Sequence, residues 1–410
     1  MVTPSGNAIV AGGYHAESGI FFTCAEEEAR TVVPDDLGET AVRDAYLFLA
    51  REMFADAALH EPRLGMAALV AFLLTGISHP VLPEKPVFCV NAPQRGSGKT
   101  TLVSMVTRAI TRRSAAAASW SVNEEERRKA FFAAAREGHG LLLVDNIPRG
   151  TVVRDATLER FATSAEVRDR VLGESRTEAV RSPVVALTGN ALQLGGDGAS
   201  RTLQIELTAE RPDPENRPFK HPDVLGWVDR NRAKILKAAL TILLGNPALR
   251  DGSATIETRF KACFVLVGSA VEHAAKLAGM PARMVDIVRA GEAADDTVAP
   301  LAELLGLLLQ AYPQQLFTVE DLTAKLNAGM GAGFDTLNAQ LLDALNSVGR
   351  QPMRAVTPKA VGAVLQRNVK GVPIDDGTGA IWVVQPRPRV SNKDRVPWSV
   401  APRSSVGGRL

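Results

Sequence analysis

A strand, a glycine-rich turn and a helix are predicted in direct succession between residues 87 and 110, and this unit constrains the fold more than any other feature of the chain. Val87–Val90 is a short apolar run, typical of a strand buried on both faces. Apolar residues recur with helical spacing from Lys99 to Ile110. The turn between them runs from Pro93 to Thr100 and contains two glycines. Such a turn at the start of a helix predicts a phosphate-binding loop, because its backbone N–H groups can converge on an anion.

The turn keeps the last three positions of the usual nucleotide-binding pattern, Gly98, Lys99 and Thr100, whereas Pro93 replaces its first glycine. Gly96 and Gly98 let backbone N–H groups approach phosphate oxygens with no Cβ in the way. We expect Lys99 to reach the β- and γ-phosphates and Thr100 to ligate Mg²⁺, so the predicted cofactors are ATP and Mg²⁺. The predicted nucleotide-binding residues are Pro93, Gln94, Arg95, Gly96, Ser97, Gly98, Lys99, Thr100 and Thr101.

Polar residues follow two further apolar runs that are predicted to be strands. Leu141–Val144 is followed by Asp145, and Val184–Leu187 leads through a Thr-Gly pair to Asn190. The carboxyl ends of parallel strands meet at one edge of a sheet. We therefore expect Asp145 to join Thr100 in holding Mg²⁺, and Asn190 to orient the attacking water. For Asn190, a simple turn at the end of a strand is the alternative.

Asn146 and Arg201 complete the set of predicted catalytic residues, which are Lys99, Asp145, Asn146, Asn190 and Arg201. Many ATPases of this pattern carry a glutamate at the position of Asn146, and an amide can position water but cannot accept its proton. Either another acid serves, from among Glu124, Glu125 and Glu126, or hydrolysis is slow; those glutamates could equally form a solvated helix face. Arg201 directly precedes the last predicted strand and could act on a neighbouring subunit's phosphate, or form a surface salt bridge.

The alternation of apolar strands with helices predicts an α/β fold with a parallel sheet. Beyond it, long helical patterns lead to three helices and a hairpin, which is a winged-helix pattern. The predicted division of the chain is an arm that could be disordered (1–38), a helical collar (39–82), a P-loop ATPase core (83–212), a helical domain (213–314), a winged-helix-like domain (315–386) and a disordered tail (387–410).

Composition argues against several other classes of protein. The net charge is +2, so any contact with nucleic acid must come from a local patch. The three cysteines and six histidines are scattered, which excludes the usual zinc spacings and a disulfide framework. Met66–Ile77 is the longest apolar run and falls short of the roughly 20 residues that span a bilayer. With no signal peptide in the pattern, we expect a cytoplasmic protein with no membrane partner, in which this run is a buried helix.

The order of Lys99-Thr100, Asp145-Asn146, Thr188-Gly189-Asn190 and Arg201 resembles the superfamily 3 helicase branch of the AAA+ ATPases, and most of all the helicase part of phage- and plasmid-type primase–helicases. The segments 161–181 and 210–219 and the winged-helix-like end also look like this family. The resemblance covers about residues 64–384. It implies an AAA+ core, a homo-oligomeric ring, commonly a hexamer, and single-stranded or forked DNA threaded through it. No primase domain is visible upstream, so a partner primase could be a separate protein, or the chain could be a degenerate relative used for another task.

The same resemblance places a DNA-contacting hairpin at Arg168, Arg170 and Arg176, whose forked donors suit phosphate. Acidic residues interleave these arginines, so a solvated ion-pair surface is the alternative. In the winged-helix-like part, Lys359, Arg367 and Lys370 could also contact DNA phosphates, although such domains also bind proteins.

The favoured function is an ATP-hydrolysing, DNA-translocating, replication helicase-like protein of a mobile genetic element. The alternative is an AAA+ switch or assembly factor that binds ATP and a protein partner in regulation or defence. A small-molecule kinase is a third class, disfavoured because no acceptor pocket is evident. Stimulation of ATP hydrolysis by single-stranded DNA would support the first hypothesis, and ATP binding without such stimulation would favour the second.

Overall fold

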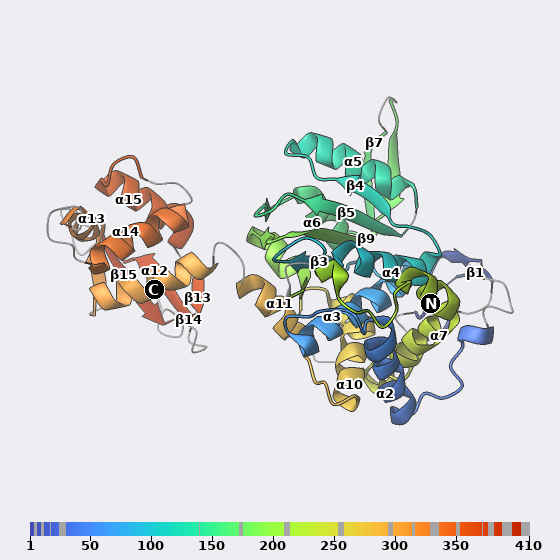
Figure 1. Ribbon diagram of the computed structural model, residues 1–410. Coiled ribbons are helices and arrows are strands. Elements are labelled where there is room, and N and C mark those ends of the chain that lie inside the picture. The colour runs from blue at the N-terminus through green and yellow to red at the C-terminus, as the bar shows by residue number, and fades with distance from the viewer. Residues whose placement is uncertain are drawn as a thin grey trace. The chain divides into compact units, whose positions relative to one another are not determined.

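The computed structural model describes residues 1–402, except 4–5, 10–11, 17, 24–29, 139, 172–174, 209–213, 253–257, 294–297, 314–315, 329–335, 350–352, 371, 376–380 and 388–395. The chain forms two compact units, Met1–Glu292 and Ala293–Leu410 (Figure 1). Each has its own hydrophobic core.

The first unit is built on a five-stranded parallel sheet with the order β11-β3-β9-β5-β4. Its strands are β3 (Val87–Ala92), β4 (Ala116–Ser119), β5 (Leu141–Ile147), β9 (Val184–Asn190) and β11 (Thr202–Glu206). The predicted α/β class with a parallel sheet is confirmed. β4 was not expected, because three of its four residues are alanines, which have little β propensity. It lies at the sheet edge with alternate residues buried, so pairing with β5 rather than local preference defines it.

Helices and a hairpin connect these strands. The connections contain α4 (Lys99–Thr111), α5 (Glu124–Arg136), the short β6 (Val152–Val153), α6 (Ala156–Thr163), the hairpin of β7 (Glu166–Arg170) and β8 (Thr177–Arg181), β10 (Gln193–Leu194), which pairs with β6, and the 3₁₀ turn η3 (Gly196–Arg201). Asn123 accepts hydrogen bonds from two backbone N–H groups at the start of α5, and Asp155 does the same for α6, so both helices begin at side-chain caps.

Helices from before and after the sheet pack together beside it (Figure 1). Before the sheet come α2 (Glu39–Phe48), the π-helical turn η1 (Leu49–Met53), α3 (Pro62–Ser78) and the short η2 (His79–Val81); after it come η4 (Pro214–Asn216), α7 (Val224–Leu244), α8 (Pro247–Asp251), α9 (Lys261–Cys263), η5 (Phe264–Gly268), α10 (Ser269–Leu277) and α11 (Met284–Ala293). α2 packs on both α7 and α10. The predicted collar and the helices as far as α11 therefore share one core with the sheet.

α3 is the central helix of that core and contains the apolar run that the sequence predicts as a buried helix. It packs against α4, α10 and β11. Among the residues that the structure describes, the stretch Pro62–Val81 is the one helix whose length and composition would allow it to cross a membrane, and 72% of its most apolar window is buried inside the fold. Its place in the core accounts for its apolarity.

The N-terminal arm and the C-terminal tail are more ordered than the sequence suggests. In the arm, β1 (Gly13–His15) and β2 (Ile20–Phe22) form a hairpin, and Val2 is fully buried. In the tail, which was predicted to be disordered, β15 (Pro397–Pro402) pairs with two strands of the second unit. Trp398 and Val400 of this strand are buried. Burial of their apolar surface stabilises the strand even though the residues around it are rich in proline and arginine.

The second unit combines helices with a four-stranded antiparallel sheet of order β12-β15-β14-β13. Its elements are α12 (Val298–Ala311), β12 (Leu316–Thr318), α13 (Val319–Ala328), α14 (Thr336–Gly349), α15 (Pro358–Val364), the π-helical turn η6 (Leu365–Val369), β13 (Pro373–Asp375), β14 (Ile381–Pro386) and β15. Thr318 and Asp321 cap α13 reciprocally, and Thr357 caps α15, as their spacing predicts. α12 was expected in the preceding helical domain, but it packs on α14 and belongs to this core.

Lys85, just before β3, is a buried cation. It is 1% exposed, and among the described residues its ammonium has no hydrogen-bond partner. Burial, reinforced by the nearby Arg181 and opposed by Cys263, lowers the pKa of Lys85 from 10.5 to about 8. Below pH 8 the fold therefore holds an ammonium that would be better solvated in the unfolded chain.

We expect Lys85→Met to stabilise the first unit at pH 7 and to raise its free energy of unfolding by at most about 3 kcal/mol. The unfolded lysine keeps its proton up to its ordinary pKa, so wild-type stability rises between pH 8 and 10.5 and the advantage of the variant shrinks. Urea unfolding across this range measures the difference. Lys234→Met, at an exposed position of α7, is the control and should show no such pH dependence. A variant less stable than wild type at pH 7 would contradict the expectation.

Candidate nucleotide-binding site

The turn between β3 and α4 is a closed loop held by its own backbone oxygens. Gly96 and Gly98 have φ angles of 76° and 85°, in the left-handed region that glycine adopts without strain. The Ser97 hydroxyl donates to the Gln94 carbonyl at 2.9 Å, and Arg149 donates to the Pro93 carbonyl at 2.7 Å. Pro93 is thus accommodated where the usual pattern has glycine. No side chain caps α4 at Gly98, so the first N–H groups of the helix are left for an anion.

Lys99 is the first residue of α4, and its ammonium lies over this loop. It donates to the Gln94 carbonyl at 3.1 Å and to Oδ1 of Asn190, at the end of β9, at 2.8 Å. Burial lowers the pKa of Lys99, and the nearby Asp145 partly offsets this. Both partners of the ammonium are neutral oxygens, so a phosphate could replace them with a gain in Coulomb attraction.

Thr100 and Asp145 meet across the end of the sheet. The Thr100 hydroxyl donates to Asp145 Oδ1 at 3.0 Å, and the hydroxyl of Thr188 donates to the same oxygen. A hydroxyl and a carboxylate are hard oxygen donors of the kind that Mg²⁺ prefers, and Mg²⁺ typically takes only a few protein ligands beside phosphate and water. These two side chains therefore fit the predicted metal.

Strand order explains why these residues meet. β9 lies between β3 and β5, with all three parallel, so the phosphate loop, Asn190 and Asp145 emerge at one edge of the sheet. This edge is where open α/β sheets bind ligands. The structure thus brings Lys99, Thr100, Asp145 and Asn190 together, as the sequence predicts.

Asn146 occupies an irregular position in β5. The register with β9 shifts between Val144 and Ile147, and Asn146 has a φ of 55°, a conformation that asparagine tolerates better than most residues. Its backbone N–H donates to Asp145 Oδ1 at 3.0 Å, and its side chain lines the cavity. The alternative acids do not reach this place: Glu125 and Glu126 pair with Lys129 on α5, and Glu124 does not line the cavity.

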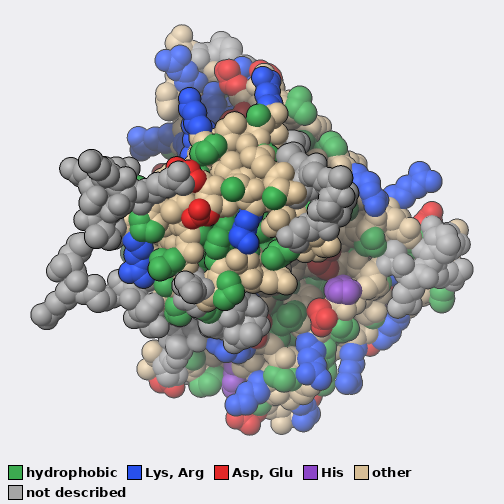
Figure 2. Space-filling model, turned by 90° about the vertical axis from the view of Figure 1, so that its left-hand side faces the viewer, with side chains coloured by type: hydrophobic (Ala, Val, Ile, Leu, Met, Phe, Trp, Pro, Cys, Tyr) green, Lys and Arg blue, Asp and Glu red, His purple; other side chains and the backbone are tan. Residues whose placement is uncertain are grey.

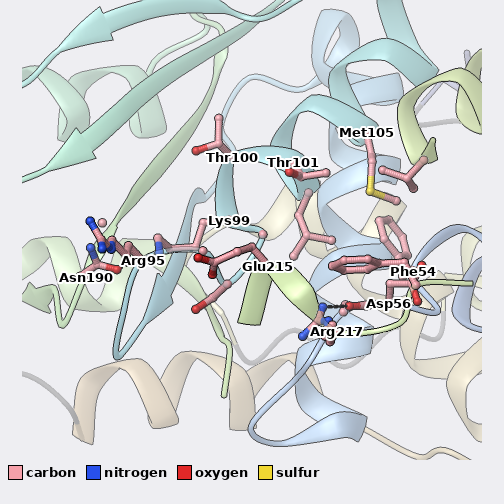
Figure 3. Close-up of a pocket in the computed structure, with 18 of the residues that line it drawn as sticks. Phe54, Asp56, Arg95, Lys99, Thr100, Thr101, Met105, Asn190, Glu215 and Arg217 are labelled. Carbon is pink, nitrogen blue, oxygen red and sulfur yellow. Dashed lines mark hydrogen bonds between the residues drawn. The ribbon is translucent and has the colours of Figure 1, made fainter. Parts of the chain in front are cut away.

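A cavity of about 680 Å³ extends from the phosphate loop (Figure 3). One end is lined by the loop, Lys99 and Asn190. The other is largely apolar and is lined by Met53, Phe54, Ala57, Met105, Pro222 and Val224. Its length and two-sided chemistry suit a molecule with a phosphate tail and a flat apolar ring. Of the described lining residues, only Asp56 and Glu215 carry a carboxylate.

Asp56 holds the two segments that form the far wall. Its carboxylate accepts hydrogen bonds from the backbone N–H groups of Lys220 at 2.9 Å and His221 at 3.2 Å, and its carbonyl accepts one from Arg217. The Lys220 ammonium also pairs with Glu52 at 2.8 Å. Sequence reasoning missed Asp56, Glu215 and His221; the resemblance included Arg217, but without a role. No local pattern marks them, because they meet only through the packing of η1 against the segment that follows β11.

Arg201 lies in an ion-pair network within its own chain. Its guanidinium donates to Glu159 at 2.6 Å and to Asp197 at 3.0 Å, and it does not line the cavity. The salt bridge considered as the alternative is therefore present. A role at a neighbouring subunit stays a prediction.

The predicted DNA-binding hairpin is present as β7 and β8. Two of its interleaved acids face away from Arg168 and Arg170, because Asp169 bonds Arg128 and Glu178 bonds Arg136 at 3.0 Å, both on α5. Arg168 and Arg170 are exposed on the opposite face of β7, and within the described residues neither has an ion-pair partner. Glu166, by contrast with those two acids, is exposed on the same face of β7 as these two arginines. Arg176 is exposed and lies 3.7 Å from Glu178. The neighbouring Glu174 falls outside the described residues.

In the second unit, Lys359, Arg367 and Lys370 are exposed on and just after α15. On the face that Figure 2 shows, Lys and Arg side chains are scattered among acidic and apolar ones. A DNA contact would therefore be local, as the net charge suggests.

Comparisons with known proteins give only distant likenesses. No protein-family model matches the chain, and no curated protein does. Among solved structures, the apo C-terminal region of NrS-1 is similar at 10% identity and a TM-score of 0.41, over 92% of this chain and 78% of that one. The JCV helicase is similar at 14% identity and a TM-score of 0.24, over 62% and 73%. At TM-scores below 0.5, these likenesses support no conclusion about function, which has to be inferred from the site itself.

Asn190→Asp would place a carboxylate on the Lys99 ammonium. We expect the new ion pair to compete with phosphate and to repel it, so that ATP affinity falls by about tenfold or more while the unfolding temperature of the nucleotide-free protein does not decrease. Asn190→Ala, which removes the oxygen without adding charge, should lower ATP affinity less. Titration calorimetry with Mg²⁺ and ATP measures both. Equal affinity of Asn190→Asp and wild type would show that Lys99 does not serve the phosphates.

Proposed function

We propose that this chain is a Mg²⁺-dependent ATPase that moves along DNA as a helicase-like protein of a mobile genetic element, acting in a homo-oligomeric ring. The observation that carries the ATP site is the meeting of Lys99 with Asn190, and of Thr100 with Asp145, at the phosphate loop. The two-ended cavity beside them supports a nucleoside triphosphate as the ligand.

The protein's own groups would act as follows. The N–H groups of residues 96–100 bind the phosphates, and the Lys99 ammonium leaves Gln94 and Asn190 for the terminal phosphate. Thr100 and Asp145 would hold Mg²⁺, which when bound neutralises charge on the phosphate oxygens. Once released from Lys99, the Asn190 amide is placed to orient the attacking water.

The DNA role rests on the exposed Arg168 and Arg170 of β7, supported by the basic residues of α15. In a ring, Arg201 would reach the phosphate of a neighbouring subunit after leaving Glu159 and Asp197.

One observation favours the second candidate, an ATP-binding switch or assembly factor with a protein partner. Asn146 supplies no proton acceptor, and neither described carboxylate of the lining belongs to β5 or β9, whose ends flank the phosphate loop. Such a site binds ATP more readily than it hydrolyses it.

Lys99→Ala should reduce ATP turnover by at least about 100-fold, because the terminal phosphate loses its main cation. Single-stranded DNA should raise the wild-type rate. The measurement is phosphate release with and without DNA, alongside the mass of the ATP-bound assembly, and Lys234→Ala serves as the control. Unchanged turnover in Lys99→Ala would refute the ATPase site; ATP binding without stimulation by DNA would favour the switch.

Replacing Arg168 and Arg170 together by alanine should weaken binding to single-stranded DNA and lower the slope of log affinity against log salt by up to about 1.4, since roughly 0.7 counterions are released per neutralised phosphate. The matched control removes two exposed charges from α7, with Arg230→Ala and Lys234→Ala. Fluorescence anisotropy over a salt series measures the slope. If both double variants keep the wild-type slope, the hairpin does not contact DNA phosphates.

A further inference from the structure

Glu215 is an acidic side chain at the edge of the phosphate loop. A Cβ on Gly96 would overlap Oε2 of Glu215 and lie 3.0 Å from its Cδ, so the carboxylate lies directly against the loop. Within the described part of the chain, Glu215 makes no hydrogen bond or ion pair that would explain its position. The carboxylate is exposed, and its negative charge would repel a phosphate rather than help to bind it, so a role toward another part of the ligand has to be considered.

The position of Glu215 is fixed by its chain neighbours. It lies in η4, and Pro214 is buried. Two residues later, Arg217 donates to the Asp56 carbonyl and stacks over Phe219 at 5.1 Å. Lys220 and His221 are then held by the Asp56 carboxylate. The carboxylate of Glu215 is therefore presented to the cavity by a segment that is fastened to the first helices of the unit.

Glu215 lies between the two ends of the cavity. Figure 3 shows it between Lys99 on one side and Phe54 on the other. A nucleotide with its phosphates on residues 96–100 and its base against Phe54 and Met53 would have its sugar at this middle place. Ionised phosphates have no hydrogen to donate to a carboxylate, whereas the ribose 2′- and 3′-hydroxyls can donate hydrogen bonds to it. Acidic residues of other nucleotide-binding folds bind ribose in this way.

We propose that Glu215 accepts hydrogen bonds from the ribose hydroxyls of the bound nucleotide and thereby selects ribonucleotides over deoxyribonucleotides. This inference rests on the proposed ATP site. It gives a carboxylate that lies against the phosphate loop a favourable partner.

The test compares binding of ATP, 2′-dATP and 3′-dATP, each with Mg²⁺, to the full chain by titration calorimetry. Wild type should bind ATP about tenfold more tightly than at least one of the deoxy analogues, as expected for loss of a hydrogen bond to a charged group. Glu215→Ala should lower ATP affinity to that of the deoxy analogue and leave the affinity for the analogue unchanged. Glu215→Gln, which keeps one acceptor oxygen, should be intermediate. Glu303→Ala, at an exposed site on α12, should behave as wild type.

Three results would overturn the inference. If Glu215→Ala tightens ATP and both analogues alike, the carboxylate merely competes with phosphate for the loop. If it weakens all three equally, the carboxylate contacts the base or supports the fold, and selects no sugar. If wild type binds ATP but does not discriminate, the ribose contact is absent while the ATP site stands. A wild-type chain that binds none of the three would instead overturn the proposed function together with this inference.

Discussion

The hydrogen bonds between Asp145 and the hydroxyls of Thr100 and Thr188 join the three parts of the candidate site. They connect the end of β5 to the start of α4 and to β9, the strand between β5 and β3. Parallel strands are needed for this arrangement, because only then do the carboxyl ends of β3, β5 and β9 lie at the same edge of the sheet. The pattern of buried strands and polar ends is thus the cause of the site, and Lys99 finds Asn190 for the same reason.

The sheet alone forms only half of a nucleotide cavity. The other half comes from η1, before the sheet, and from the segment 214–224 after it, which Asp56 fastens together through two backbone N–H groups and one carbonyl. α2 and α7, which flank these two segments, pack on each other. The packing of chain segments more than 150 residues apart therefore decides the shape of the base end, whereas the phosphate loop itself is encoded within a dozen consecutive residues.

This difference sets what could be predicted from the sequence. β3, β5 and β9 were predicted because apolar runs mark strands that are buried on both faces, and the loop because glycine placement and a following helix have a direct physical meaning. β4 was missed because alanines carry no strand signal, and β15 because its Pro- and Arg-rich surroundings conceal Trp398 and Val400. Asp56 and Glu215 could not have been predicted, since a solitary acid gains significance only from what long-range packing places beside it.

Asn146 bears on how the proposed ATPase would work. The bulge in β5 gives this residue a left-handed backbone that suits asparagine, and its side chain can hold a water but cannot take its proton. Asp145 is engaged by two hydroxyls. Of the two carboxylates in the described lining, Asp56 lies in the far wall and Glu215 lies beside Gly96, and neither is at the end of β5. No proton acceptor is therefore present at the β5 end of the described lining, and in the proposed ring an adjoining subunit could supply one. If the proposed ATPase does act in a ring, such a chain would turn over ATP slowly when alone and faster once assembled, and the absence of a glutamate at position 146 would couple hydrolysis to assembly.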